Sequence, residues 1–250
     1  MLFRSVKRLK SVPFRDPESF TFKSDAESTN KAILKEVKAL EILQKSPFVI
    51  RYFGCTSIGR QLGLVTEYLN NGTLFEWLYK KDLPKEHEGN IQLGIAQGFS
   101  YIHECEIAHN DVKSSNIMLD SLFVPRIIGL SMSKIINTST KTNTQPAFLG
   151  TAQWRSPECW DLDNTVDIRR KLPYVSDVYS FGVLLGEFYK VAPWEELKNI
   201  EIKKKVLAGE RPYKENNIPN DVYAIMEKCW KQGSDERIAM KEVVELLKNK

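Results

Sequence analysis

The chain has 250 residues, and its 36 basic and 32 acidic side chains leave a formal net charge of +4, too balanced for a nucleic-acid-binding protein. Hydrophobic residues make up 42% of the chain and charged residues 27%, the proportions of a water-soluble globular protein. The longest apolar run, Phe181–Gly186, is too short to cross a bilayer, and residues 1–7 lack the apolar stretch of a signal peptide, so we expect a cytoplasmic protein without a nucleic-acid or membrane partner.

The part of the chain before residue 70 mixes strand and helix signals. Polar and apolar residues alternate loosely over 2–10, which predicts a strand. Residues 27–45 predict a helix. The residues expected on its core-facing side recur at helical spacing and are Ile33, Val37, Leu40 and Gln44. Ser46-Pro47 is expected to end that helix, and two further strands are predicted over 49–55 and 62–68.

After residue 70 the pattern becomes mainly helical. Helices are predicted over 73–79, 87–104, 176–190, 196–208, 219–230 and 239–248. Between them, residues 129–158 are rich in Ser and Thr and show no periodicity. The pattern indicates an α+β protein in which a mixed part, 1–69, and a helical part, 70–250, form a single domain over 1–250.

The stretch Ile107–Asp120 carries an acid, a lysine and an amide on one short loop between two apolar runs. Asp111 can accept a proton from a hydroxyl, Lys113 can hold a phosphate, and Asn116 can give an oxygen to a divalent cation. These are three parts of a phosphoryl-transfer site, where catalysis is mostly positioning and charge neutralisation. The stretch resembles the catalytic loop of protein kinases, H-R-D-L-K-x-x-N, with Asn110 in place of the arginine.

The order of elements resembles a protein kinase over most of the chain. Residues 64–74 look like the connection between the two kinase lobes. That resemblance implies that Thr66 is the gatekeeper and that the backbone of Glu67 and Leu69 meets the adenine edge of ATP. It also places Met118 at the cofactor. The resemblance therefore implies a bilobal kinase-like fold with a nucleotide site between a small and a large lobe.

Further stretches of the large lobe support the same family. Residues 150–158 look like the G-T-x-x-W-x-x-P-E end of the activation segment, which implies a buried pair between Glu158 and Arg237. Residues 177–182 resemble the central helix of the large lobe, where the aspartate holds the catalytic loop by hydrogen bonds. Cys229-Trp230 and the catalytic-loop sequence are similar to the Ser/Thr members of the tyrosine-kinase-like group.

Two parts of an active kinase are missing from this pattern. Gly129 stands where the aspartate of D-F-G, the principal magnesium ligand, is expected, and a residue without a side-chain oxygen cannot replace it. No G-x-G-x-x-G sequence exists in the chain, and only six residues precede Lys7, the candidate for the ATP-contacting lysine. We therefore expect a truncated N-lobe that lacks the first two strands and the Gly-rich loop. Glu36 is the predicted partner of Lys7, and an ordinary surface pair is the alternative.

Asn110 is a further departure from the kinase pattern. In regulated kinases the arginine at this place receives a phosphate group on the activation segment. An amide cannot form a charged, two-pronged contact with phosphate. The resemblance therefore predicts that the usual ordering partner of a phosphorylated segment is missing.

Two functions stay open on these residues. The first is a pseudokinase, a signalling protein that binds a kinase or a scaffold protein and transfers phosphate poorly, with weak ATP binding and an unsettled magnesium site. The second is a weakly active Ser/Thr kinase that transfers the ATP γ-phosphate to protein hydroxyls and holds magnesium with Asn116 and the substrate phosphates alone. A third interpretation is a piece of a longer protein whose first strands lie upstream of Met1. We favour the first, because a catalytic metal contributes several kcal/mol to the transition state.

Overall fold

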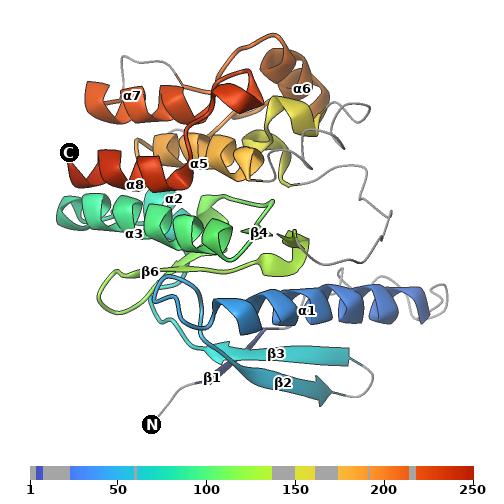
Figure 1. The fold of residues 1–250 in the computed structure, drawn as a ribbon. Coiled ribbons are helices and arrows are strands. Elements are labelled where there is room, and N and C mark those ends of the chain that lie inside the picture. Colours follow the sequence, from blue (N-terminus) through green and yellow to red (C-terminus); the bar gives the residue numbers. More distant parts are fainter. Residues whose placement is uncertain are drawn as a thin grey trace.

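The small lobe is a three-stranded sheet with one long helix lying across it (Figure 1). The computed structural model describes residues 4–7, 23–58, 61–136, 150–160, 174–190, 192–213 and 218–250. The small lobe contains β1 (Arg4–Lys7), α1 (Lys23–Leu43), β2 (Tyr52–Ile58) and β3 (Gln61–Glu67). The strands are antiparallel in the order β1-β3-β2, and Lys7 lies opposite Leu64 in the register. Of the strand predicted over 2–10, only residues 4–7 are described, and they form β1.

Helix α1 buries the face that its sequence pattern predicts. The buried apolar positions are Ile33, Val37, Leu40 and Leu43. Glu36 lies on the same face and is only 3% exposed, so this carboxylate is directed into the protein. Gln44 was expected on the buried face but is exposed, because α1 ends at Leu43 and the chain turns before that position reaches the core.

The connection from α1 to β2 joins the small lobe to the large lobe. The strand predicted over 49–55 begins instead at Tyr52, because the preceding residues pair with the large lobe. Ile127 N donates to Phe48 O at 2.7 Å, and Ile50 N donates to Ile127 O at 3.1 Å. Phe48 and Ile127 lie against Gly98, where an added Cβ would come within 2.9 Å of Phe48 Cβ. This glycine therefore provides the room in which the connection packs.

The large lobe is built from helices around two short sheets. Its elements are α2 (Leu74–Tyr79), α3 (Lys85–Glu104), β4 (Ile107–Ala108), η1 (Ser114–Asn116), β5 (Ile117–Leu119), β6 (Pro125–Ile127), η2 (Leu130–Met132), β7 (Lys134–Ile135), η3 (Ala152–Trp154), η4 (Pro157–Cys159), α5 (Val175–Glu187), α6 (Asn199–Leu207), α7 (Asn220–Cys229), η6 (Ser234–Glu236) and α8 (Met240–Lys248). The predicted helices are confirmed, with ends within about three residues of the predicted ones. The α+β class is confirmed as well.

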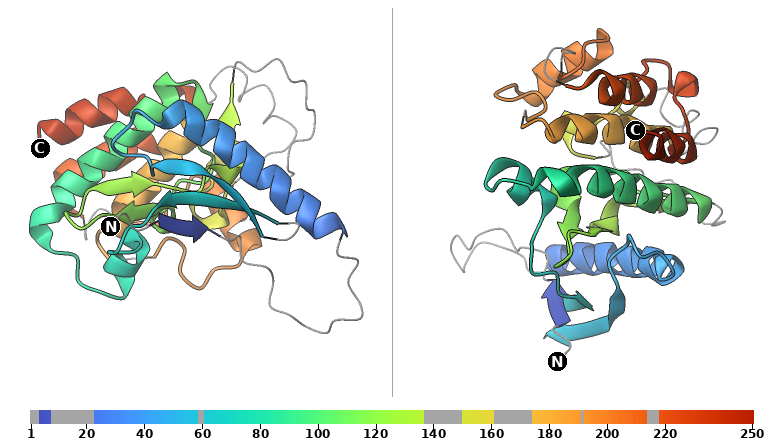
Figure 2. Two further views of the ribbon diagram at one scale, coloured as in Figure 1. Left: turned by 90° about the horizontal axis from the view of Figure 1, so that it is seen from below. Right: turned by 90° about the vertical axis from the view of Figure 1, so that its left-hand side faces the viewer.

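Helix α5 forms the centre of the large lobe and lies among α3, α7 and α8 (Figures 1 and 2). Its sequence is apolar on nearly every side, which is the pattern of a helix surrounded by protein. The two short sheets pair β4 with β7 and β5 with β6, and they lie between the large helices and the small lobe. Within the described ranges, no helix combines the length and apolar character that a membrane span requires.

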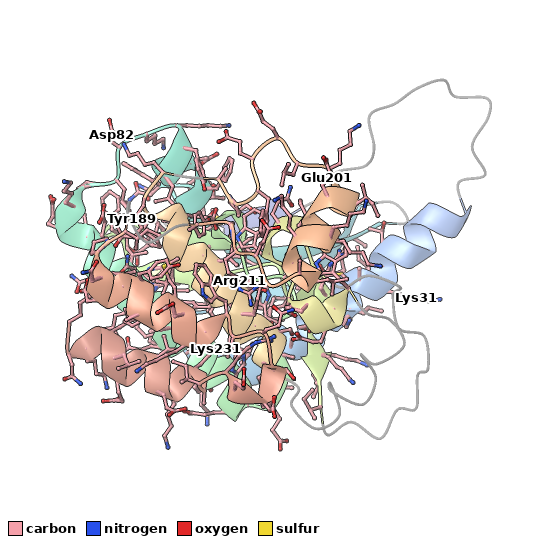
Figure 3. The ribbon with its side chains drawn as sticks, turned by 90° about the horizontal axis from the view of Figure 1, so that it is seen from above. Lys31, Asp82, Tyr189, Glu201, Arg211 and Lys231 are labelled. Carbon is pink, nitrogen blue, oxygen red and sulfur yellow. The ribbon has the colours of Figure 1, made fainter. Side chains whose placement is uncertain are left out.

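A buried ion pair links the end of the predicted activation segment to the last part of the large lobe. Arg237 Nη1 and Nη2 donate to the two oxygens of Glu158 at 2.7 and 2.8 Å, which confirms the predicted pair. Both residues are 7% exposed. Burial raises the pKa of Glu158, but the contact with Arg237 outweighs it and the net pKa is lowered. The guanidinium groups of Arg237 and Arg211 also lie 5.1 and 5.3 Å from the Tyr179 ring, and Figure 3 shows Arg211 among the helices of the large lobe.

We predict that Arg237→Met lowers the free energy of unfolding by about 3–5 kcal/mol, because it leaves the Glu158 carboxylate buried without its cation. The double substitution Glu158→Leu/Arg237→Met is expected to recover most of that loss, since it removes both buried charges together. Urea denaturation followed by circular dichroism measures both. A loss below about 1 kcal/mol for Arg237→Met would show that the pair does not hold the segment.

Candidate functional site

The predicted catalytic loop is held in place by a buried carboxylate at the start of α5. Asp177 is 1% exposed and accepts the backbone N–H groups of His109 and Asn110, each at 2.7 Å. His103 Nε2 lies 3.1 Å from the same carboxylate. Burial raises the pKa of Asp177, but the contacts with His103 and the backbone outweigh it and lower the net pKa. The expected role of Asp177 is thus confirmed, and His109 is a fully buried core residue, as predicted.

The loop brings the three predicted catalytic side chains into contact. Lys113 Nζ lies 2.9 Å from Asp111 Oδ2, and Asn116 Nδ2 donates to the same oxygen at 2.8 Å. Asn116 Nδ2 also donates to the Asp111 carbonyl at 2.7 Å. Burial raises the pKa of Asp111, but Lys113 and the hydrogen bonds outweigh it and lower the net pKa. Asp111 is therefore an ionised hydrogen-bond acceptor at neutral pH.

Thr151 places a hydroxyl directly on this carboxylate. Thr151 Oγ1 donates to Asp111 Oδ1 at 2.7 Å, and the Thr151 backbone N–H donates to the same oxygen at 3.1 Å. Lys113 Nζ donates to Thr151 Oγ1 at 2.5 Å. A small pocket beside these groups lies between the catalytic loop, η3–η4 and the start of α5. Sequence reasoning placed Thr151 in the G-T-x-x-W-x-x-P-E stretch but did not predict its contact with Asp111, which lies 40 residues earlier in the chain.

Gly129 packs directly against the amide that would hold a cation. Its backbone is left-handed, with φ of 81° and ψ of 35°. An added Cβ would lie 2.6 Å from Asn116 Oδ1, which is closer than real Cβ contacts. Within the described ranges no three His, Cys, Asp or Glu side chains gather as metal ligands. Asn116 Oδ1 alone is a poor fit to Mg²⁺, which takes several hard oxygen ligands in octahedral geometry.

Asn110 makes hydrogen bonds of its own in place of the missing arginine. Its φ is 64°, in the left-handed region that Asn tolerates better than most residues. Its Nδ2 donates to Ala108 O at 3.3 Å and to Met132 O at 3.2 Å. The amide therefore ties the catalytic loop to the end of η2 through neutral groups, without a phosphate.

The predicted cofactor residues lie where the small lobe leads into the large lobe. Thr66 is 3% exposed near the end of β3, and its Oγ1 donates to Glu67 O at 3.2 Å. Leu69 is buried in the connection to α2, and Met118 lies on β5, bridged to the residue that caps α2. The backbone of Lys7 belongs to β1, but its side chain lies outside the described part of the chain. Its pairing with Glu36 stays a prediction.

Glu187 is a buried carboxylate that sequence reasoning missed. It is fully buried at the end of α5 and lies where the catalytic loop, the segment end and α2 meet. Its donors are Ser114 Oγ at 2.5 Å, Trp154 Nε1 at 2.8 Å, Ser114 N at 3.3 Å and Tyr79 Oη at 3.3 Å. Burial raises its pKa to about 7 in spite of these donors. The available signal was a charged residue inside the apolar run of α5.

Comparison with known proteins identifies the family. A profile described as protein tyrosine and serine/threonine kinase matches residues 21–247. The chain belongs to the protein kinase family. The matched range contains α1, the catalytic loop and the described helices of the large lobe up to the last residue but one of α8, and it begins after Lys7. Kinases of this family generally bind ATP and magnesium, which is a property of the family and not an observation on this chain.

Individual kinases are similar at moderate identity. The RGS domain-containing serine/threonine-protein kinase A of Dictyostelium discoideum is 29% identical over 86% of this chain and 18% of its own length. The serine/threonine-protein kinase CTR1 of Arabidopsis thaliana is 29% identical over 89% of this chain and 27% of its own length. The high affinity nerve growth factor receptor of Rattus norvegicus is 28% identical over 88% of this chain and 29% of its own length. This kinase chain thus spans less than a third of the length of these relatives.

We predict that Gly129→Ala lowers the free energy of unfolding by more than Gly209→Ala. Both glycines have positive φ, 81° and 86°, so both variants carry the left-handed strain of about 1–2 kcal/mol. Only Gly129 has a neighbour within reach of the new methyl group, so overpacking against Asn116 adds about 1–3 kcal/mol there. Urea denaturation of the two variants measures the difference. Equal losses would contradict the packing of Asn116 on Gly129.

We predict that the buried Glu187 makes the kinase domain less stable as the pH rises from about 4.5 to about 7. The folded protein binds this proton more tightly than the unfolded chain, so raising the pH through this window costs about 1.4 kcal/mol for each unit of pKa shift. Glu187→Gln should flatten the plot of unfolding free energy against pH, because its amide mimics the neutral acid and does not titrate. Its oxygen can accept from Trp154, and its NH₂ can donate to Ser114 Oγ. Urea denaturation at a series of pH values measures both profiles. If the unfolding free energies of the variant and the wild type change in parallel with pH, Glu187 is not the group responsible.

Proposed function

We propose that the chain is a pseudokinase, a signalling protein that binds a protein partner, a kinase or a scaffold, through its large lobe and has impaired phosphoryl transfer. The single observation that carries the proposal is Gly129, whose Cα lies so close to Asn116 that even a methyl group does not fit. The principal oxygen ligand of the catalytic cation has no counterpart there. A loss of about 4 kcal/mol of transition-state stabilisation slows a reaction roughly a thousandfold.

The small lobe supports the same proposal. The sequence has no Gly-rich loop to cover the ATP phosphates, and β1 with Lys7 is the first described strand. We infer that residues 1–250 by themselves supply no glycine-rich cover for the phosphates of a bound nucleotide. ATP binding through Thr66, Glu67, Leu69 and Met118, with Lys7 and Glu36 at the phosphates, is then expected to be weak.

A weakly active Ser/Thr kinase is the second candidate, and the geometry around Asp111 favours it. Thr151 Oγ1 already occupies the position of a hydroxyl on an ionised acid, with Lys113 beside it. Two of the similar proteins described above carry serine/threonine kinase names. In this candidate the substrate phosphates supply most of the oxygen ligands of magnesium. The absence of any thermal shift with millimolar ATP and magnesium would exclude it.

We predict that the purified chain transfers γ-phosphate from radiolabelled ATP to a general protein substrate no faster than its Asp111→Asn variant. The substitution keeps the size of the side chain and removes the acceptor of the hydroxyl proton. An active Ser/Thr kinase under the same conditions serves as the positive control. Robust transfer that disappears in Asp111→Asn would overturn the pseudokinase proposal and favour the second candidate.

A further inference from the structure

One guanidinium group contacts both lobes and the turn that follows α1. Arg126 lies on β6, which runs between α3 and α1 (Figure 1). Its Nη1 donates to Pro47 O, after α1, at 2.5 Å. Its Nη2 donates to Asp120 Oδ2, after β5, at 3.0 Å, and its Nε lies 3.5 Å from Glu67 Oε1 at the end of β3.

The groups that Arg126 reaches are themselves held in place. Asp120 Oδ1 accepts the backbone N–H groups of Leu122 and Val124, each at 2.9 Å, so this carboxylate is fixed to the β5–β6 turn. Glu67 Oε1 accepts the backbone N–H of Arg51 at 2.9 Å, and Glu67 N donates to Arg51 O at 2.9 Å. Arg126 therefore connects two local frameworks, one in each lobe.

Burial makes these contacts more effective than surface ion pairs. The side chains of Arg126, Glu67 and Asp120 are 18%, 24% and 19% exposed. By comparison, the pair between Lys190 and Asp82 on the large lobe is 62% and 92% exposed. Screening by water is weaker for the partly buried group, and the planar guanidinium can serve three acceptors in fixed directions, which a lysine cannot do.

We propose that Arg126 is a positioning residue that fixes the end of β3 and sets the orientation of the small lobe on the large lobe in the absence of nucleotide. The inference rests on the proposed function in one respect, because Glu67 is the residue whose backbone is expected to meet the adenine. The kinase-like shape that a partner protein recognises is then maintained by the protein's own ion pairs. A bound nucleotide is not needed to hold the two lobes together.

Distances between spin labels in the nucleotide-free protein test this directly. One label is attached to Cys55, which is exposed on β2, and the other to Lys231→Cys, at an exposed position after α7 that Figure 3 labels. Cys105→Ser removes the other accessible thiol. We expect a narrow distance distribution in this background and a broader one, shifted in its mean, when Arg126→Met is added. Arg126→Lys should fall between them, because a single ammonium cannot reach all three acceptors.

Two further variants separate positioning from general damage. Lys205→Met removes an exposed ion pair with Glu210 within the large lobe and is expected to leave the distances unchanged. Glu67→Gln keeps the side-chain volume and removes the charge that Arg126 contacts, so it should broaden the distribution in the same way. Unchanged distributions in both Arg126→Lys and Glu67→Gln, with the fold intact by circular dichroism, would overturn the proposal even if Arg126→Met fails to fold.

The affinity for ATP gives a second readout, because it would not change if Arg126 only stabilised the fold. We expect Arg126→Met and Glu67→Gln each to weaken metal-free ATP binding severalfold. We expect the double variant to be no weaker than Arg126→Met alone, because the contact that Glu67→Gln weakens is already lost in Arg126→Met. Additive losses would overturn the coupling through Glu67. Robust phosphoryl transfer would refute the pseudokinase proposal and leave the distance result standing, so the two failures are distinguishable.

Discussion

The contact between Asn116 and the bare Cα of Gly129 is the constraint on which the account of this kinase-family chain depends. Asn116 is held by two hydrogen bonds to Asp111, so its amide oxygen cannot withdraw easily from the glycine. Because the glycine backbone is left-handed and its Cβ direction is blocked, a carboxylate cannot be introduced at Gly129 without moving Asn116. The glycine at position 129, where an aspartate is expected, is thus required by the packing of Asn116 against it.

The framework of the large lobe is independent of this defect. Asp177 holds the backbone of the catalytic loop, Glu158 and Arg237 hold the segment end, and Glu187 joins the loop to α2. None of these three contacts needs a nucleotide or a metal ion to form. The proposed role in protein binding needs only this framework, because it depends on the shape of the large lobe and not on phosphoryl transfer.

The sequence predicts the helices well, because apolar residues such as Ile33, Val37 and Leu40 recur every three or four positions and do bury one face. It also predicts the short loop that carries Asp111 and Asn116, and the structure shows the hydrogen bonds between them. It does not predict which partner a short strand chooses, so residues 49–50 were assigned to the sheet although they lie against β6. Thr151 on Asp111 and Arg126 on Glu67 escaped prediction for the same reason, since both contacts join segments far apart in the chain.

The affinity of the purified chain for ATP, measured by calorimetry with EDTA and again with excess Mg²⁺, tests the central claim most directly. The account predicts equal, weak affinities, because the protein lacks the oxygen ligand that anchors the cation to it. An affinity that rises about tenfold or more with Mg²⁺, and falls back in Asn116→Ala, would show that the protein does anchor the cation and would contradict the account.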